Sequence, residues 1–298
     1  MSSARGPILV TGMPRSGTTW LARLLATAPG TALTGREPMN PRGRQYALAG
    51  TLHGWTELTA VSDRQERALR RAYHGRTPWV FSRYGRRQWS APLPWTRVVV
   101  KDPYAMLSAP VVQRVTAATV VLLYRHPGAA LASYRRVGWE PAVQELRPVQ
   151  QEHQRAHGGE VGNTAVPERG DADQASTVSR FWAALYGIAL DHAAETSGLV
   201  IVSHEELSAG GVAAARKLFE RLGLQWNRAA EQEMLGKAAT GRAGGSVSTQ
   251  ALHDFARSPR DVSGAWRDQL SPEELLTVEE TTQKVRDRLH ESRLQLVG

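Results

Sequence analysis

Short apolar runs alternate with segments of helical periodicity along most of this chain. The apolar runs predict strands at 7–11, 97–101, 119–125 and 199–203. Apolar positions that recur every three or four residues predict helices at 18–28, 108–117, 127–137 and 176–197. Alternation of this kind is typical of a parallel sheet with helices packed on both faces. We therefore predict an α/β fold with a central parallel sheet flanked by helices.

Two stretches interrupt this alternation, and two further helices follow them, at 211–239 and 271–291. Residues 36–96 are predicted to be an insertion between the first and second strands of the sheet. Residues 138–175 contain several Gly and Pro residues with little apolar periodicity, and the stretch is too long for an ordinary connection. We predict a mobile loop on the substrate side; an insertion without function is the alternative. With both insertions, residues 1–298 are predicted to form a single domain.

The chain is strongly basic. Its 298 residues carry a net charge of +9, and arginines gather between residues 64 and 97. This cluster is either the solvated face of a helix or a surface for an anionic acceptor or carrier. A basic balance often indicates nucleic-acid or membrane binding. Because no helix-turn-helix signature, zinc-ligand spacing or aromatic-basic RNA motif is found, we predict no nucleic-acid partner.

Cysteine is absent from the sequence, which excludes disulfides, thiol catalysis and cysteine-ligated metal. The amino terminus lacks a signal-peptide pattern, since only Ile8 to Val10 form an apolar stretch before a polar loop begins. No apolar run approaches the length of a membrane span. We predict a cytoplasmic protein without a membrane span.

A glycine-bounded loop follows the first predicted strand. Gly12 and Gly17 have the spacing of a P-loop, whose backbone amides hold phosphate, but Thr18 stands where a P-loop has lysine, and Arg15 is the loop's only cation. In P-loop kinases, lysine and Mg²⁺ together neutralise a polyphosphate. A sulfuryl group carries about one negative charge, so backbone amides and one cation can support its transfer without metal. The loop therefore favours sulfuryl transfer.

The loop sequence also carries a resemblance to a known family. Residues 14–20 read Pro14-Arg15-Ser16-Gly17-Thr18-Thr19-Trp20. This segment resembles the 5′-phosphosulfate loop of the sulfotransferases that use 3′-phosphoadenylyl sulfate (PAPS), which usually has Pro-Lys/Arg-Ser-Gly-Thr-Thr. The resemblance implies that Pro14 to Thr19 bind the 5′ end of the donor.

A second anion motif lies about a hundred residues further on. Arg125 ends the apolar run that starts at Val120, and His126-Pro127 then opens a predicted helix, because proline is favoured at the first helical position. Ser133 lies eight residues after Arg125, about two turns into that helix, so both side chains can reach one phosphate. The same Arg-x₇-Ser arrangement marks the 3′-phosphate site of PAPS-dependent sulfotransferases.

The resemblance extends from residue 7 to about 280 and implies a P-loop-like three-layer fold. It also implies an enzyme that transfers a sulfuryl group from PAPS to a hydroxyl of a small-molecule, carbohydrate or lipid acceptor. The product would be adenosine 3′,5′-bisphosphate (PAP), and no metal would be needed. One alternative is a small-molecule kinase that uses ATP and Mg²⁺, with Asp102 as a Walker B carboxylate. Another is a nucleotide- or nucleic-acid-binding protein without catalysis.

Glu37 is the first candidate for the base that an alcohol acceptor requires. Residues 29–35 are expected to return along a short extended stretch, which leaves Glu37 at the mouth of the loop; pairing with Arg36 or Arg42 on the surface is the alternative. Tyrosylprotein and some carbohydrate sulfotransferases carry a glutamate at about this offset, whereas cytosolic aryl and steroid enzymes use a histidine further on. Lys101, at a carboxyl strand end, either contacts the acceptor or sulfuryl group or forms a salt bridge with a carboxylate.

Three more basic residues are candidates for the donor site. His204 stands where the family's Tyr-Glu-Asp-Leu segment places a tyrosine against adenine; a strand-terminal histidine bonded to backbone is the alternative. Arg257 and Arg260 precede a Gly-x-Trp sequence similar to the family's segment that closes on the 3′-phosphate, and they are either phosphate clamps or surface charges. Trp20 and Trp182 are predicted to be core residues.

Overall fold

The structure is a computed structural model, and it describes most of the chain. The described residues are 6–34, 37–42, 48, 50–75, 95–158, 164–168, 170, 172–236 and 266–297. The predicted phosphate clamps Arg257 and Arg260 lie outside these ranges.

A parallel sheet of five strands forms the centre of the described part of the chain, in the order β2-β3-β1-β4-β5. The strands are β1 (Ile8–Thr11), β2 (Thr31–Thr34), β3 (Arg97–Lys101), β4 (Thr119–Tyr124) and β5 (Val200–Ser203). All run in the same direction, so their carboxyl ends meet at one edge. The α/β fold with a central parallel sheet, predicted from the alternation of apolar runs and helices, is confirmed.

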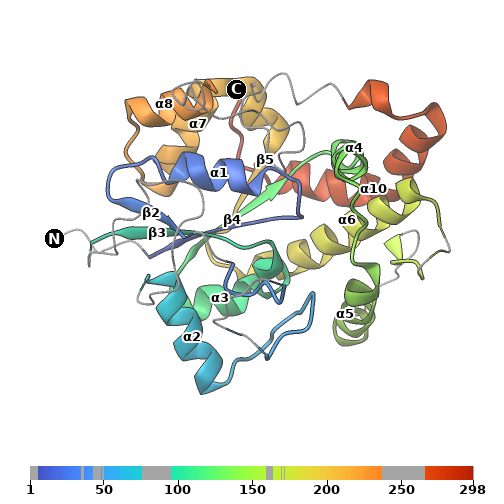
Figure 1. Ribbon diagram of the computed structural model, residues 1–298, viewed down its shortest axis with the longest axis horizontal. Coiled ribbons are helices and arrows are strands. Elements are labelled where there is room, and N and C mark those ends of the chain that lie inside the picture. The colour runs from blue at the N-terminus through green and yellow to red at the C-terminus, as the bar shows by residue number, and fades with distance from the viewer. Residues whose placement is uncertain are drawn as a thin grey trace.

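The two faces of the sheet bury two separate cores. Ile8 and Val10 of β1 face one core, built with α1 (Thr18–Leu25), α7 (His204–Leu222) and α8 (Arg228–Met234). Leu9 faces the other, larger core. The helices of that second face are α2 (Asp63–Tyr73), α3 (Ala109–Thr116), α4 (Pro127–Val137), α5 (Val143–His157), α6 (Gln174–Asp191) and α10 (Pro272–Ser292). Figure 1 shows α1, α7 and α8 together on one side of the strands and α2 and α3 on the other. The near-continuous apolar strands are explained by this burial on both faces.

The extended stretch predicted after the first helix becomes strand β2 of the sheet, paired with β3. The residues predicted as an insertion therefore follow β2 and precede β3, which corrects their placement between the first two strands. Within them lies α2, which opens with a capping box at Ser62 and Gln65. The arginines of this helix, Arg64, Arg67, Arg70 and Arg71, are all exposed, as expected for a solvated face.

The prediction of a loop over 138–175 is wrong for Val143–His157, which form helix α5. The buried positions of α5 are Val143, Leu146, Gln150 and His153, spaced three or four residues apart. Two of these four are polar, so the apolar periodicity that identifies a helix is only half present in the sequence. Pro148 inside the helix weakens the signal further.

The carboxyl-terminal helices also differ in detail from the prediction. The helix predicted at 211–239 is two helices, because Gly223 adopts a left-handed conformation and ends α7. Within α7 the backbone is not helical at Gly211, which has a φ of 57°, so the predicted start at 211 falls at this kink and a further helical segment precedes it directly after β5. Helix α10 starts with a capping box, in which Glu274 N donates to Ser271 Oγ at 3.2 Å and Ser271 N donates to Glu274 Oε2 at 2.8 Å. The described residues also form three short 3₁₀ helices. These are η2 (Pro103–Ser108), η4 (His192–Glu195) and η5 (Arg267–Gln269). Of the helices described, none combines the length and the apolar character needed to cross a lipid bilayer.

Candidate active site

The predicted site residues gather at the carboxyl edge of the sheet. The chain passes from β3 to β4 across β1, so the strand connections diverge on either side of β1. Ligands of open α/β sheets bind in the crevice that forms at such a point. The glycine-bounded loop follows β1 there, Lys101 ends β3 opposite Val10, and Arg125 directly follows β4.

The loop after β1 has a backbone that few sequences can adopt. Gly12 has a φ of 146°, and a Cβ at this position would lie 2.1 Å from the carbonyl oxygen of Leu123. Arg15 and Gly17 also have positive φ values, of 74° and 94°. Gly17 is the N-cap of α1 and supplies no side-chain cap, so the first amides of this helix point out of its end without an intrahelical acceptor. Such an end, with the helix dipole behind it, favours an anion.

The hydroxyl of Tyr186, in α6, is hydrogen-bonded to the loop that follows β1. Its hydroxyl donates to the carbonyl of Leu123 at 2.8 Å and accepts from the Met13 amide at 3.1 Å. The Ser16 hydroxyl lies 3.1 Å from the same oxygen, and because the Tyr186 proton is directed at Leu123, Ser16 is the donor. The Ser16 amide is also used, since it donates to the Met13 carbonyl at 3.1 Å. Ser16 is fully buried, so its polar groups serve the shape of the loop.

The two predicted anion motifs meet in the structure. Arg15 Nε donates to Ser133 Oγ of α4 at 3.1 Å. On its other side, the Arg15 guanidinium lies 5.6 Å from the ring centroid of Trp139, in a cation–π arrangement. The residues that the resemblance assigns to opposite ends of one nucleotide are therefore neighbours.

Arg125 is buried beside Ser133's helix, and its backbone is fixed by α6. The indole of Trp182 donates to the Arg125 carbonyl at 3.0 Å. Burial lowers the pKa of Arg125, the Glu205 carboxylate opposes this change, and Arg136 and Arg15 lower the pKa further. Burial likewise lowers the pKa of Arg15, with Arg136 adding to the effect. Three guanidinium groups that repel one another at the end of a buried strand are the arrangement expected of an anion site.

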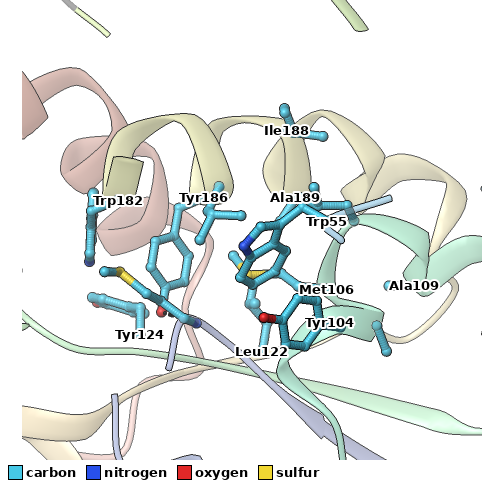
Figure 2. Close-up of a cluster of buried hydrophobic side chains, with 14 of the residues drawn as sticks. Trp55, Tyr104, Met106, Ala109, Leu122, Tyr124, Trp182, Tyr186, Ile188 and Ala189 are labelled. Atoms are coloured by element: carbon cyan, nitrogen blue, oxygen red, sulfur yellow. Dashed lines mark hydrogen bonds between the residues drawn. The ribbon is translucent and has the colours of Figure 1, made fainter. Parts of the chain in front are cut away.

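Trp182 and Tyr186 are one helical turn apart on the same face of α6, and Figure 2 shows both side chains pointing from this helix towards the strands. One contacts the carbonyl of Arg125 and the other the loop after β1, so a single helix face supports both anion motifs. The prediction of Trp182 as a core residue is confirmed. Trp20 is only partly buried, at the edge of the smaller core.

His126 caps the helix that carries Ser133. Its Nδ1 accepts the Gly128 amide at 3.2 Å, which places the remaining proton on Nε2, 3.3 Å from a carboxylate oxygen of Glu279. Burial lowers the pKa of His126 to about 4, and Arg286 lowers it as well, so the neutral form that can accept the amide is kept. Its ring stacks on Trp266 at 4.4 Å, so the carboxyl-terminal segment packs against the start of α4.

Glu37 and Lys101 form an ion pair at the neighbouring strand end. Asn40 donates to the other carboxylate oxygen of Glu37. The salt bridge left open for Lys101 therefore exists, and its partner is the candidate base. Of the two alternative surface partners of Glu37, Arg42 binds Glu145 and the hydroxyl of Tyr104 instead, and Arg36 lies outside the described residues.

Asp102, the residue of the Walker B alternative, is fully buried and turned into the protein. Its two oxygens accept the amides of Met39 at 2.6 Å and Tyr104 at 3.1 Å. Burial, with a contribution from the Glu37 carboxylate, raises the pKa of Asp102 to about 8, although the two amides and Lys101 oppose the change. Because both oxygens accept backbone amides, the Asp102 side chain fixes the backbone at the end of β3.

The ring of His204 packs against the loop that follows β1. A Cβ on Gly17 would be 2.7 Å from Cδ2 of His204, so this glycine allows the ring to lie directly against the loop backbone. Burial lowers the pKa of His204 to about 3, and Arg125 contributes, which keeps the imidazole neutral. Its edge meets Trp20 at a centroid distance of 5.6 Å. Among the described residues neither His204 Nδ1 nor Trp20 Nε1 has a hydrogen-bond partner.

Four residues of this site were not found from the sequence. Tyr186 and Trp182 appear there as two aromatics in an apolar helix, which a core explains equally well. Arg136 and Trp139 had a usable signal, because a charged and an aromatic residue follow Ser133 within six positions.

The fold and this edge are those of an α/β protein with a P-loop-like anion loop that lacks the P-loop lysine. A sequence profile of the sulfotransferase family matches residues 7–228, and the chain belongs to that family. No curated protein matches the chain. Among solved structures, the sulfotransferase domain from the curacin biosynthetic pathway is 14% identical, with a TM-score of 0.53 over 98% of this chain and all of that domain. Mouse sulfotransferase SULT7A1 complexed with PAP is 16% identical, with a TM-score of 0.49 over 98% of this chain and 90% of that one. The family predicted from the loop and the Arg-x₇-Ser motif is confirmed.

Proposed function

We propose that this protein transfers a sulfuryl group from PAPS to a hydroxyl of a small-molecule, carbohydrate or lipid acceptor. The observation that carries the proposal is the hydrogen bond between Arg15 and Ser133, which joins two anion motifs on adjacent strand ends. A donor with phosphates at both 5′ and 3′ positions of one ribose requires two such groups of ligands close together. ATP has no 3′-phosphate, so an ATP-type donor requires only the ligands of the 5′ end.

The loop after β1 would hold the 5′ end of the donor through the amides at the start of α1. Arg15 would neutralise the bridging oxygen as the bond from sulfur to the leaving phosphate breaks, which is where negative charge develops. Arg125 and Ser133 would hold the 3′-phosphate, with Arg136 adding positive charge from the surface. Ser16, whose hydroxyl is bonded to Tyr186, would position the loop rather than touch the donor.

His204 and Trp20 would form the adenine side of the site. A neutral imidazole offers one donor and one acceptor, which suits the edge of a base. Trp20, predicted to be a core residue, is half-buried and directly follows the loop; its Nε1 is itself buried and has no hydrogen-bond partner among the described residues. Stacking of a base on such a ring stabilises a bound nucleotide without contributing to the transfer.

Glu37 would take the proton of the acceptor hydroxyl while the new bond from oxygen to sulfur forms. Lys101 and Asn40 hold both oxygens of its carboxylate, which fixes the direction from which the acceptor must approach. Close to Glu37, the Arg42–Glu145 pair lies beside Tyr104, which is buried and stacked on Trp55 at 4.6 Å. These charged groups would bind a polar part of the acceptor.

The donor assignment is tested by the shift in melting temperature with PAP alone compared with ATP plus Mg²⁺. A ligand that binds only the folded chain raises its melting temperature. The proposal expects the larger shift with PAP in the presence of a chelator. A larger shift with ATP that disappears on chelation would support the kinase alternative instead. Formation of a sulfated product from PAPS, lost in Glu37→Gln, would then establish the transfer.

A further inference from the structure

A cluster of histidine and carboxylate side chains lies outside the sulfuryl-transfer site, beyond the end of α6. It joins three segments: Glu57 from the chain before α2, His153 and His157 from α5, and His192 at the start of η4. His192 lies six residues after Tyr186 on the same helical path, which is about 9 Å along the axis. Nothing in the proposed transfer of a sulfuryl group uses these side chains.

The core of the cluster is buried, and two imidazole nitrogens approach the same oxygen of one carboxylate. Glu57 Oε1 lies 2.8 Å from His153 Nδ1 and 2.8 Å from His192 Nε2. The side chains of Glu57, His153 and His192 are 9%, 5% and 8% exposed. Although close to Glu57, His192 Nε2 makes no hydrogen bond of normal geometry among the described residues. Buried polar atoms are usually well bonded, so this one requires an explanation.

In each of the two histidines of α5, one ring nitrogen already has a hydrogen-bond partner in the protein. His153 Nε2 lies 3.2 Å from Asp191 Oδ2, and Arg288 donates to the other oxygen of Asp191 at 2.7 Å. His157 Nδ1 lies 3.0 Å from the His153 carbonyl. A histidine that donates one ring N–H to a carboxylate or carbonyl presents the lone pair of its other nitrogen, which is the outer-shell arrangement of metal-ligating histidines. Here it leaves His153 Nδ1 and His157 Nε2 as the ligating nitrogens.

We propose that Glu57, His153 and His157 bind a divalent transition metal such as zinc, with His192 as the fourth ligand. One ligand atom from each of Glu57, His153 and His157 lies within 4.8 Å of the other two. Ligands of tetrahedral zinc are about 3.3–3.6 Å apart for bonds of about 2.0–2.2 Å, so small rotations of these side chains close the site. Three imidazoles with one carboxylate suit zinc and its neighbours better than Mg²⁺ or Ca²⁺, which prefer oxygen.

The site has an entrance and a structural consequence. His157 is exposed, so a metal can reach the buried ligands from solvent on this side. Binding would displace the proton between His153 Nδ1 and Glu57 Oε1 and would tie α5 to α6 and to the segment before α2. Helix α5 also carries Glu145, which pairs with Arg42 in the segment that follows Glu37. The metal would thus fix α5 near its far end while this ion pair fixes its beginning.

The test is a titration of the tag-free, chelator-treated chain with Co²⁺, followed by displacement with Zn²⁺. The expected result is the visible absorption of tetrahedral Co²⁺ saturating at one equivalent, its loss on addition of Zn²⁺, and a higher melting temperature with either metal. His157→Gln changes an exposed side chain and should weaken Co²⁺ binding at least tenfold. His290→Gln, an exposed histidine on α10, is the matched control and should bind as the wild type does.

Asp191→Asn tests the outer shell separately, and we expect about 10–100-fold weaker binding because the partner of His153 is altered. The proposal is overturned if the wild-type chain shows no saturable tetrahedral Co²⁺ spectrum. It is equally overturned if His157→Gln binds Co²⁺ as tightly as His290→Gln does. Neither result depends on a sulfuryl donor or acceptor.

Discussion

Arg15 and Ser133 are 118 positions apart in the sequence and share a hydrogen bond of 3.1 Å between Nε and Oγ. Their contact explains how two short motifs on different strands become one site. Parallel strands β1 and β4 are neighbours in the sheet, so the segments that follow their carboxyl ends are brought side by side. The pair connects the loop that would hold the 5′ end of a nucleotide with the helix that would hold its 3′-phosphate.

Exchanging the two arginines for alanine should separate binding from turnover. Arg125→Ala should chiefly raise the Kd for the donor, since a buried charged contact is lost. Arg15→Ala should chiefly lower kcat, by about 10²–10³-fold, since its charge is needed when the leaving phosphate forms. Steady-state kinetics of sulfate transfer from PAPS separates the two parameters. Small and equal effects of both changes on both parameters would contradict the assigned roles.

Replacing the candidate base should affect turnover alone. Glu37→Gln keeps the shape of the side chain but removes the proton acceptor, and we expect kcat to fall by about 10²–10⁴-fold. The affinity for PAP, measured by calorimetry, should stay within about twofold. Glu66→Gln, on the exposed face of α2, is the control and should retain activity. A Glu37→Gln enzyme with near-normal kcat would remove Glu37 from the mechanism.

Removing one hydroxyl beneath the loop should lower both stability and donor affinity. Tyr186→Phe leaves the Met13 amide, the Ser16 hydroxyl and the Leu123 carbonyl without their shared partner, which we expect to cost about 1–3 kcal/mol of unfolding free energy. Tyr73→Phe is the matched control, because the buried Tyr73 hydroxyl has no partner among the described residues. Urea unfolding of both variants measures the difference. Equal stabilities would show that Tyr186 does not brace the loop.

Adding one methyl group to the loop should be strongly destabilising. Gly12→Ala places a Cβ 2.1 Å from the Leu123 carbonyl oxygen at a φ of 146°; the position of the Cβ is set by the backbone of residue 12, and the oxygen belongs to the backbone of β4, so neither atom can turn away. We expect a loss of about 3 kcal/mol or more, or failure to fold. Gly187→Ala in α6 should be tolerated, because its Cβ would lie 4.0 Å from the nearest atom, in Val285. Comparable melting temperatures for the two variants would mean that the loop backbone is not held as described.

Asp102 should make the protein less stable as the pH rises. Burial raises its pKa to about 8 in the folded state, compared with 3.8 for the free side chain. Between about pH 4 and pH 8 the folded chain therefore keeps a proton that the unfolded chain has lost, so the unfolding free energy falls with increasing pH, by at most about 1.4 kcal/mol per unit for this group. Asp102→Asn cannot titrate, and its stability should fall less over this range. Identical pH slopes in urea unfolding would rule out this contribution.

The sequence predicted the elements that bury apolar residues regularly and the motifs that have fixed spacing. Strands β1, β3, β4 and β5 and helix α10 appear at the expected positions because an apolar run or a capping box is a local signal. Arg15, Arg125 and Ser133 were found for the same reason. Helix α5 was missed because Gln150 and His153 occupy half of its buried positions.

Other features depend on contacts between distant segments. The bracing of the loop by Tyr186 and the pairing of Glu37 with Lys101 join residues 170 and 64 positions apart from their partners. No local pattern encodes such a pair, since the sequence around each residue gives no sign of the partner that the folded sheet brings next to it. The buried orientation of Asp102 is of this kind as well, because it depends on the amide of Met39.

The most direct test compares the affinities of PAP and adenosine 5′-phosphate in the wild-type chain and in Arg125→Ala, by calorimetry without divalent metal. Together the four values isolate the interaction between Arg125 and the 3′-phosphate. We predict that the wild-type chain binds PAP about 10–100-fold more tightly and that Arg125→Ala loses most of this difference while binding adenosine 5′-phosphate normally. A preference for PAP that survives in Arg125→Ala, or that is absent from the wild-type chain, would contradict the account.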